Sequence, residues 1–270
     1  MKKLSIASWN INSVRAHLPH LLNWLSRRNP DVLLLQEIKT MADTFPAKEI
    51  EEMGYNLLIS GQKTYNGVAI LSKYPIQLEN KFLPGMDHDP QARYLEAIIE
   101  TNPCVWRIIN VYVPNGNPYP GDKFSYKLQW LEALRQYAQK ILAFEENVVI
   151  GGDFNIIPTD DDVYDPVAWQ DDALCRPESR QFFRSILNSG YSDALRLQTN
   201  EKKLYTFWDY QAGRWPRGEG LRIDHFLISP QAADRLQQVV IDKHTRAEEK
   251  PSDHVPILAQ FNNQETQGIE

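Results

Sequence analysis

The sequence predicts an α/β domain in which sheets and helices form separate layers. Three observations indicate this class: short β-type runs recur, amphipathic helical segments lie between some of them, and no linker or fixed-period repeat divides the 270 residues. A chain of this length can bury most of its apolar surface around one core. We therefore expect a single domain over residues 1–262, followed by a polar, disordered tail at 263–270.

Runs rich in β-branched and aliphatic residues, several of them bounded by turn-forming residues, predict the strands. In chain order they cover residues 4–9, 32–36, 67–71, 94–100, 105–113, 147–151, 223–228 and 255–261. The second run is strongly apolar, which is typical of a buried strand.

Apolar residues at helical spacing predict the helices between these strands. The first contains Leu18, Leu21, Leu22 and Leu25 and ends at the stop signal Asn29-Pro30. A longer helix is expected from about 123 to 144, and a third at roughly 178–187, closed by Gly190. A short helix follows Pro230.

Composition favours a soluble, cytoplasmic protein. Apolar residues make up 42% of the chain and charged residues 24%, and no apolar run approaches the roughly 20 residues that span a bilayer. The first residues are too polar for a secretory signal, and Cys104 and Cys175 lack metal-type spacing, so we expect reduced thiols. Nothing indicates a membrane partner or more than a monomer.

The net charge of 29 − 35 = −6 argues at first against a nucleic-acid partner. Much of the excess is local, however, in the acidic stretch between Asp160 and Asp172. A site that holds a divalent cation must also be acidic. The total charge therefore weakens the case for a phosphate-rich substrate but does not exclude one.

Polar residues stand where predicted strands end, and loops at sheet edges commonly carry function. Their burial beside core residues would be costly unless they bind one another or a cation. The segments are Trp9-Asn10-Ile11-Asn12, Gln36-Glu37, Gly152-Asp153-Phe154-Asn155, Ile223-Asp224 and Ser252-Asp253-His254.

These groups suit metal-assisted phosphoryl transfer. Mg²⁺ prefers carboxylate and carbonyl oxygen, and Glu37 is the expected main ligand, with Asn10 and Asp253 close by. Asp153 can align or deprotonate the attacking water, and Asn155 can hold that water or the developing oxyanion.

A protonated His254 can bind a phosphate oxygen, and the carboxylate of Asp224 would orient its ring and raise its pKa.

Each residue also has a plain structural interpretation. Asn10 could be a turn residue, Glu37 a strand terminus at solvent, and Tyr112 a core aromatic. Trp208 could be a residue that packs in the interior, although its polar neighbours hint at an exposed aromatic platform. The joint occurrence of these residues favours function over the structural interpretations.

The ordered motifs resemble those of the endonuclease/exonuclease/phosphatase superfamily, and more narrowly exonuclease III-type apurinic/apyrimidinic endonucleases. The resemblance extends from about residue 3 to 261. Its motifs are Trp9-Asn10-Ile11-Asn12-Ser13, Leu35-Gln36-Glu37, Asn110-Val111-Tyr112-Val113-Pro114-Asn115-Gly116, Gly152-Asp153-Phe154-Asn155, Leu221-Arg222-Ile223-Asp224 and Pro251-Ser252-Asp253-His254. It implies a four-layered α/β sandwich, with two mixed sheets face to face and helices outside.

The resemblance also implies the roles of residues. The implied metal ligands, for Mg²⁺ with Mn²⁺ as a substitute, are Glu37, Asn10, Asp153, Asn155 and Asp253. The implied catalytic residues are Tyr112, Asp153, Asn155, Asp224 and His254. Substrate contacts are expected from Asn12, Arg93, Asn115, Trp208 and Arg222, with Lys123, Arg214 and Arg217 as further candidates for backbone phosphates. Asn12 stands where some relatives have aspartate, and Ser13 where glycine is common.

The implied activity is hydrolysis of double-stranded DNA 5′ to abasic sites, with 3′→5′ exonuclease and 3′-phosphatase activity at blocked 3′ ends. Two alternatives remain: a phosphatase for inositol phosphates or phospholipids, and a non-catalytic DNA-binding protein. Three segments resemble the DNA repair branch of the superfamily and oppose the first alternative: Val113-Pro114-Asn115-Gly116, the stretch from Asn155-Ile156-Ile157-Pro158 through Asp165-Pro166-Val167-Ala168-Trp169, and Thr206-Phe207-Trp208-Asp209-Tyr210. The complete set of catalytic candidates opposes the second.

Overall fold

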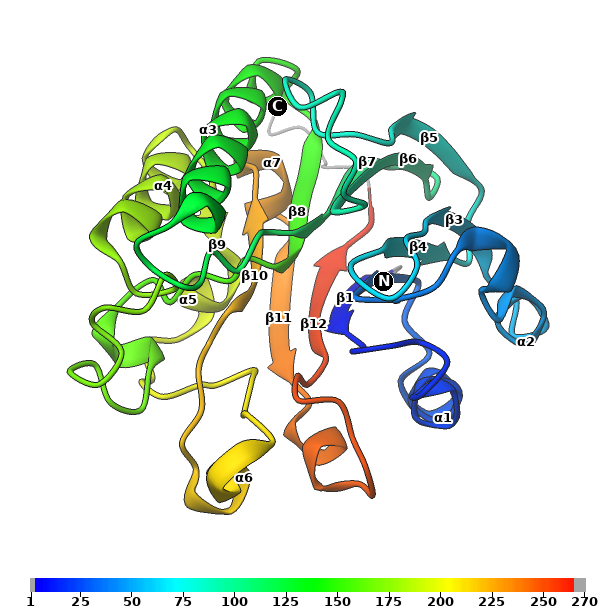
Figure 1. Cartoon of the computed structure of the whole chain (residues 1–270). Coiled ribbons are helices and arrows are strands. Elements are labelled where there is room, and N and C mark those ends of the chain that lie inside the picture. Colours follow the sequence, from blue (N-terminus) through cyan, green and yellow to red (C-terminus); the bar gives the residue numbers. More distant parts are fainter. Residues whose placement is uncertain (1–2, 265–270) are drawn as a thin grey trace.

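Two six-stranded mixed sheets lie face to face with helices on their outer sides (Figure 1). The computed structural model describes residues 3–264. The first sheet has the order β11-β12-β1-β2-β4-β3, with bounds Leu236–Ile241, Ile257–Asn262, Lys3–Asn10, Val32–Gln36, Val68–Ser72 and Asn56–Ser60. The second has the order β5-β6-β7-β8-β10-β9, with bounds Ile76–Asn80, Tyr94–Glu100, Val105–Tyr112, Asn147–Asp153, Asp224–Ile228 and Ser192–Asp193. The four-layered sandwich is confirmed.

Helices cover the outer faces of both sheets. The α-helices are α1 (Leu18–Arg28), α2 (Ala47–Glu51), α3 (Asp122–Leu142), α4 (Pro177–Asn188), α5 (Ala194–Gln198), α6 (Arg214–Arg217) and α7 (Pro230–Ala233). Short 3₁₀ turns occupy Ala42–Thr44, Asp160–Asp162, Gln211–Gly213 and Lys243–Ala247. None of the helices within residues 3–264 is both long and apolar enough to cross a membrane.

Alternation along the strands divides the core into an inner layer and two outer layers. Between the sheets, Ile6 and Leu34 of the first pack with Ile108 and Val149 of the second. On the outer face of the first sheet, Trp9 and its neighbours pack against α1 and α2. On the outer face of the second, residues of β7 and β8 pack against α3 and α4.

A buried amide ladder crosses between the sheets below the strand ends. The Gln36 side-chain amide donates to Asn110 Oδ1 at 2.7 Å, and Asn110 Nδ2 donates to the carbonyls of Leu35 and Ala69. All of these side chains are fully buried. Because apolar contacts alone do not set strand register between two sheets, these bonds help align β7 with β2 and β4.

All eight predicted strands are present, and each of their ends lies within two residues of its prediction. The four strands that the sequence pattern missed are β3, β5, β9 and β11, and these are the four edge strands of the two sheets. Interior strands are covered on both faces and therefore carry long apolar runs, whereas edge strands are partly exposed and carry a weaker pattern. The four predicted helices are also present, while α2, α5 and α6, each of four or five residues, were missed.

The predicted tail begins too early. Asn263 is fully buried, and its Oδ1 accepts hydrogen bonds from Thr101 Oγ1 at 2.8 Å and Trp106 Nε1 at 3.2 Å. The chain therefore remains packed against the second sheet through this residue. Residues 265–270 lie outside the described part of the chain.

Candidate active site

The ends of strands from both sheets converge on one buried cluster of polar side chains. Asn10 ends β1 of the first sheet, and Glu37 directly follows β2. Asp153 ends β8 of the second sheet, where it is paired in register with Tyr112 of β7 and Asp224 of β10. Since the sheets lie face to face, the polar groups at these ends meet across the gap between them.

Asn10 connects the two carboxylates at the centre of this cluster. Its Nδ2 donates to Glu37 Oε1 at 2.8 Å and to Asp153 Oδ2 at 3.0 Å, while its Oδ1 accepts from the backbone of Asn12. Asn10 is fully buried. It presents nitrogen rather than oxygen to the carboxylates, so here it aligns the predicted ligands.

Glu37 is held in an uncommon backbone conformation. Its φ is 49°, in the left-handed region that a non-glycine residue rarely occupies and that costs roughly 1–3 kcal/mol. Tyr112 donates its hydroxyl to Glu37 Oε1 at 2.9 Å, and Lys39 Nζ lies 2.8 Å from Oε2. Burial opposes ionisation, but Lys39 and the Asn10 hydrogen bond hold the pKa of Glu37 below its usual value. Glu37 is therefore an anion aimed into the site.

Burial, together with the anions of Glu37 and Asp153, raises the pKa of Tyr112 well above its usual value, so its hydroxyl remains a hydrogen-bond donor.

Asp153 and Asn155 form the second side of the cluster. Asp153 Oδ1 accepts the backbone N–H of Asn155 at 2.9 Å, which closes a turn where Asn155 has a φ of 47°. The Asn155 side chain donates to the Val113 carbonyl and accepts from Asn115 Nδ2 at 3.1 Å. Asp153 is almost fully buried, and burial raises its pKa. A carboxylate with a raised pKa suits proton transfer near neutral pH.

His254 and Asp224 form a buried pair beside Asp153. His254 Nδ1 lies 2.9 Å from Asp224 Oδ2, and its Nε2 lies 3.8 Å from Asp153 Oδ2. Burial disfavours the imidazolium, but the carboxylates of Asp224 and Asp153 raise the pKa of His254. The ring is therefore a cation with Nε2 directed toward the cluster. Phe207 packs edge-on against it, with ring centroids 4.9 Å apart.

Asp253 and Asn12 lie at the entrance to the cluster. Asn12 Nδ2 donates to Asp253 Oδ1 at 3.0 Å and to the Tyr210 hydroxyl at 3.2 Å, and Lys39 donates to Asn12 Oδ1. Burial raises the pKa of Asp253, and the nearby anion of Glu37 adds to this effect. The predicted contact residue Asn12 is thus tied to a predicted metal ligand.

The donor set fits a hard divalent cation. Glu37, Asp153 and His254 each offer a ligand atom, and these atoms all lie within 4.8 Å of one another. Two of the three are carboxylates, the ligands that Mg²⁺ prefers. The group contains the predicted ligands Glu37 and Asp153 but not Asp253, and it includes His254, which was predicted only as a catalytic residue. As an imidazolium, His254 has no lone pair free for a metal, so the two carboxylates would hold the ion.

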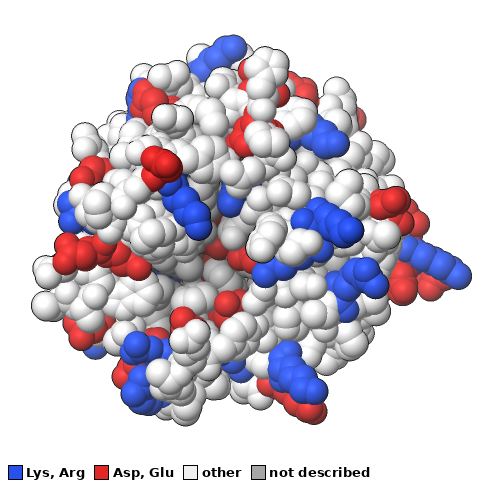
Figure 2. All heavy atoms as spheres, in the orientation of Figure 1, with Lys and Arg blue, Asp and Glu red and all other residues white. Residues whose placement is uncertain are grey.

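Charged side chains of both signs surround a hollow in the molecular surface. Figure 2 shows a hollow near the middle of the face, with acidic side chains inside it and lysine and arginine side chains around it. Such an arrangement can attract a phosphate-bearing ligand to the rim while the centre retains a cation. The net charge of −6 therefore does not describe every part of the surface.

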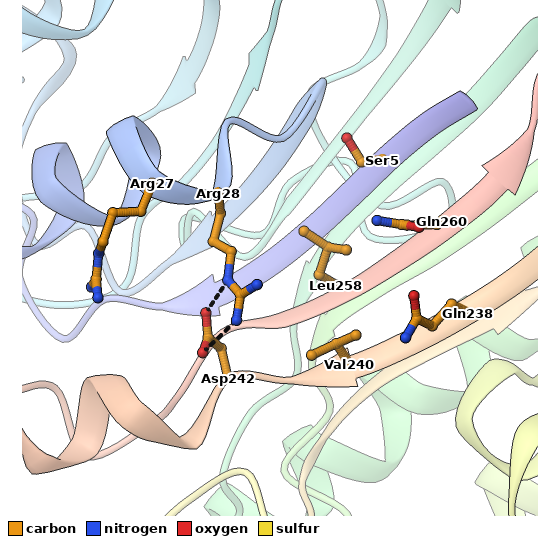
Figure 3. Close-up of a pocket in the computed structure, with 8 residues that line it drawn as sticks. All are labelled: Ser5, Arg27, Arg28, Gln238, Val240, Asp242, Leu258 and Gln260. Atoms are coloured by element: carbon orange, nitrogen blue, oxygen red, sulfur yellow. Dashed lines mark hydrogen bonds and ion pairs between the residues drawn. The ribbon is translucent and has the colours of Figure 1, made fainter. Parts of the chain in front are cut away.

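A separate hollow of about 280 Å³ lies on the first sheet, where it is lined by Ser5, Gln260 and Val240 (Figure 3). Its Arg28 donates two hydrogen bonds to Asp242, so that guanidinium is already paired. None of the predicted site residues lines this hollow.

Two predicted substrate contacts are corrected. Arg222 is 1% exposed and donates hydrogen bonds to Asp162 and Asp193, so it stabilises the interior instead of contacting a backbone phosphate. Trp208 is 3% exposed and packs against Trp215, with ring centroids 4.8 Å apart, so it is not an exposed platform. The packing interpretation of Trp208 is the correct one.

The other predicted basic residues differ in whether their charged groups already have partners within the protein. The Arg93 guanidinium lies 4.5 Å from the centre of the Tyr112 ring and donates to the Tyr112 carbonyl, so it also supports that residue. Arg214 and Arg217 both pair with Glu219, and Lys123 is exposed.

Sequence reasoning missed two lysines at the site. Lys39 bonds both Glu37 and Asn12, and its position two residues after Glu37 was a usable signal. Lys127 lies behind Asn155 and is fully buried on α3, although nothing in the sequence distinguishes it from an exposed helical lysine. Burial lowers the pKa of Lys127 to about 7, against the attraction of Asp172 and Asp153.

Comparison with known proteins identifies the family. The model of the Endonuclease/Exonuclease/phosphatase family matches residues 7–254. Exodeoxyribonuclease III of Haemophilus influenzae is 34% identical over 266 residues, which cover 96% of this chain and 100% of that protein.

Among solved structures, a Neisseria 3′ phosphatase bound to a product DNA hairpin has a TM-score of 0.92 and 42% identity, covering 96% of this chain and 99% of that one. An apurinic/apyrimidinic endonuclease from Archaeoglobus fulgidus has a TM-score of 0.88 and 36% identity, also covering 96% and 99%. The resemblance inferred from the motifs is confirmed. The chain belongs to the endonuclease/exonuclease/phosphatase family and, within it, to the phosphodiesterases of the exodeoxyribonuclease III type.

Proposed function

We propose that this protein is a Mg²⁺-dependent DNA repair nuclease that hydrolyses the phosphodiester bond 5′ to abasic sites. At 3′ ends of double-stranded DNA it also acts as a 3′→5′ exonuclease and a 3′-phosphatase. The observation that carries the proposal is the placement of Asp153 between Asn10 and the His254–Asp224 pair. The relatives support the same chemistry: one is an exodeoxyribonuclease III, another a 3′ phosphatase, and a third an abasic endonuclease.

Each residue has a role that follows from its contacts. Asp153, a buried carboxylate with a raised pKa, accepts a proton from the attacking water. The His254 imidazolium donates from Nε2 to a phosphate oxygen, while Asp224 fixes its orientation through Nδ1. Asn155 orients the water through its side-chain amide, and Tyr112 directs its hydroxyl toward the phosphate once a substrate is present.

Glu37 and Asp153 are the proposed holders of Mg²⁺, with Asp253 completing the acidic environment. The bound ion would act as a Lewis acid on the phosphoryl group and stabilise the leaving oxygen. Mn²⁺ has similar ligand preferences and is expected to substitute. The predicted cytoplasmic location and monomeric state belong to the same proposal.

The test uses two end-labelled duplexes, one with a single abasic-site analogue and one with a 3′-phosphate. Each is incubated with Mg²⁺ or with chelator, using the wild type, Asp153→Asn, and the control Asp234→Asn. Asp234 is exposed and follows α7, at the opposite end of β10 from Asp224.

We expect metal-dependent incision 5′ to the abasic site and release of the 3′-phosphate, both abolished by Asp153→Asn alone. Release of the 3′-phosphate without incision would restrict the function to 3′-end processing. No reaction on either duplex would refute the DNA substrate, and inositol phosphates and phospholipids would then be tried.

A further inference from the structure

Lys127 is a fully buried lysine whose partners are backbone carbonyls. It lies in the second turn of α3, and its side chain is 0% exposed. Nζ donates to the carbonyl oxygens of Asn115 at 3.0 Å, Asn155 at 2.6 Å and Ala173 at 3.3 Å. An ammonium has three N–H donors and no acceptor, so three carbonyls match its capacity.

These three carbonyls belong to segments far apart in the sequence. Asn115 follows β7, Asn155 follows β8, and Ala173 lies in the connection that leads to α4. Among residues 3–264, the Lys127 side chain thus joins three loops, two of which follow the ends of interior strands of the second sheet. Side chains reinforce the attachment, because Asn117 bonds both the Asp172 carboxylate and the Ala173 N–H.

The bonded segments carry groups of the proposed reaction. The side chains of Asn115 and Asn155 bond each other at 3.1 Å, and the Asn155 N–H bonds Asp153. Asn155 has a φ of 47°, in the left-handed region that asparagine adopts more readily than most residues, and its carbonyl bonds Lys127. The bond from Lys127 to the Asn155 carbonyl acts on the same turn.

We propose that Lys127 is a positioning residue, whose ammonium fixes Asn155 and Asn115 relative to Asp153 by holding all three loops together. The proposal rests on the proposed nuclease function for its kinetic consequence. Lys127 touches no reacting atom, so it acts through Asn155. Its loss should therefore lower kcat while leaving KM almost unchanged.

The main variant is Lys127→Met, which keeps the length of the side chain and removes the three donors. A second variant, Lys127→Gln, keeps two N–H donors on a shorter chain and serves if the methionine variant does not fold. The matched control is Leu134→Ala, a fully buried change on the same helix that packs against the sheet without bonding these loops.

Two measurements are made on each variant. The first is single-turnover and steady-state cleavage of the labelled duplexes below the thermal transition. The second is backbone amide hydrogen exchange without DNA, read at the N–H groups of Asn117, Asn155 and Ala173.

We expect Lys127→Met to lower kcat by about 10- to 100-fold with KM within about threefold, as for other small misplacements of catalytic groups. Exchange should increase at the three amides but not in the sheet core. Lys127→Gln should lie between the wild type and Lys127→Met. Leu134→Ala should reduce thermal stability and retain kcat.

A wild-type kcat in Lys127→Met, or an equal loss of kcat in Leu134→Ala, would overturn the proposal. So would exchange that rises throughout α3 and the sheet instead of in the three loops. If the wild-type protein does not cleave DNA, the proposed function fails, while the exchange measurement still decides whether Lys127 holds the loops.

Discussion

Replacing Asp224 by asparagine removes a charge from the buried pair with His254 and preserves the shape of the side chain. Both residues are at most 4% exposed, and the bond between Asp224 Oδ2 and His254 Nδ1 is 2.9 Å long. Hydrogen bonds to charged groups contribute about 1.5–3 kcal/mol. If the imidazolium is required in the transition state, this loss corresponds to a decrease in kcat of about 10- to 150-fold.

The assay is single-turnover cleavage of the abasic duplex in a double-mutant cycle with His254→Gln. Because Asp224 should act only through His254, Asp224→Asn should have little further effect in the His254→Gln background. Circular dichroism melting establishes that each variant is folded. Equal losses of kcat in both backgrounds would show that Asp224 acts independently, and a loss below about threefold in the single variant would refute the orienting role altogether.

Three further outcomes are expected. Arg222→Met should lower the free energy of unfolding by about 3–5 kcal/mol, because it leaves Asp193 buried without its cation and leaves Asp162 with Arg196 alone. The salt dependence of DNA binding should be unchanged, and a smaller salt slope would show that Arg222 contacts a phosphate after all. Burial lowers the pKa of His225 to about 4, so below about pH 6.5 this residue binds more protons in the unfolded state than in the folded state. As pH drops from there to about 4, the contribution of His225 to the free energy of unfolding should fall by about 3 kcal/mol, measured in urea titrations as the difference between the wild type and His225→Gln. Glu37→Gln should weaken Mn²⁺ binding by more than about 10-fold in calorimetry, and unchanged affinity would exclude Glu37 as a main ligand.

The structure shows which parts of the sequence pattern were informative about the fold. The interior strands, such as β2 with its run of aliphatic residues, were predicted closely because both of their faces are buried. Edge strands such as β5, with three exposed residues, have only one neighbour and too little apolar pattern for detection. The short helices α2, α5 and α6 were missed for a related reason, because helices of a few residues depend on tertiary contacts rather than on their own periodicity. The equally short α7 was predicted from the start signal at Pro230.

For the site as for the strands, local sequence features were predictable and contacts between distant segments were not. Asn10, Glu37, Asp153, Asp224 and His254 were recognisable because each is a polar residue at a strand end, and the structure brings all five together. Their exact partners were not recognisable, because hydrogen bonds such as that from Asn10 to Asp153 join residues far apart in sequence. Their catalytic roles remain predictions until the variants are measured.

The sequence by itself determined the layered α/β class, the family, and the polar residues that interrupt apolar strands. These are local properties, since alternation and apolar runs record which face of a strand is buried. Only the tertiary structure decided that Arg222 and Trp208 are interior residues and that Lys127 joins three loops. The burial of a polar or aromatic side chain depends on which distant segments pack over it, and that information is absent from the neighbouring sequence.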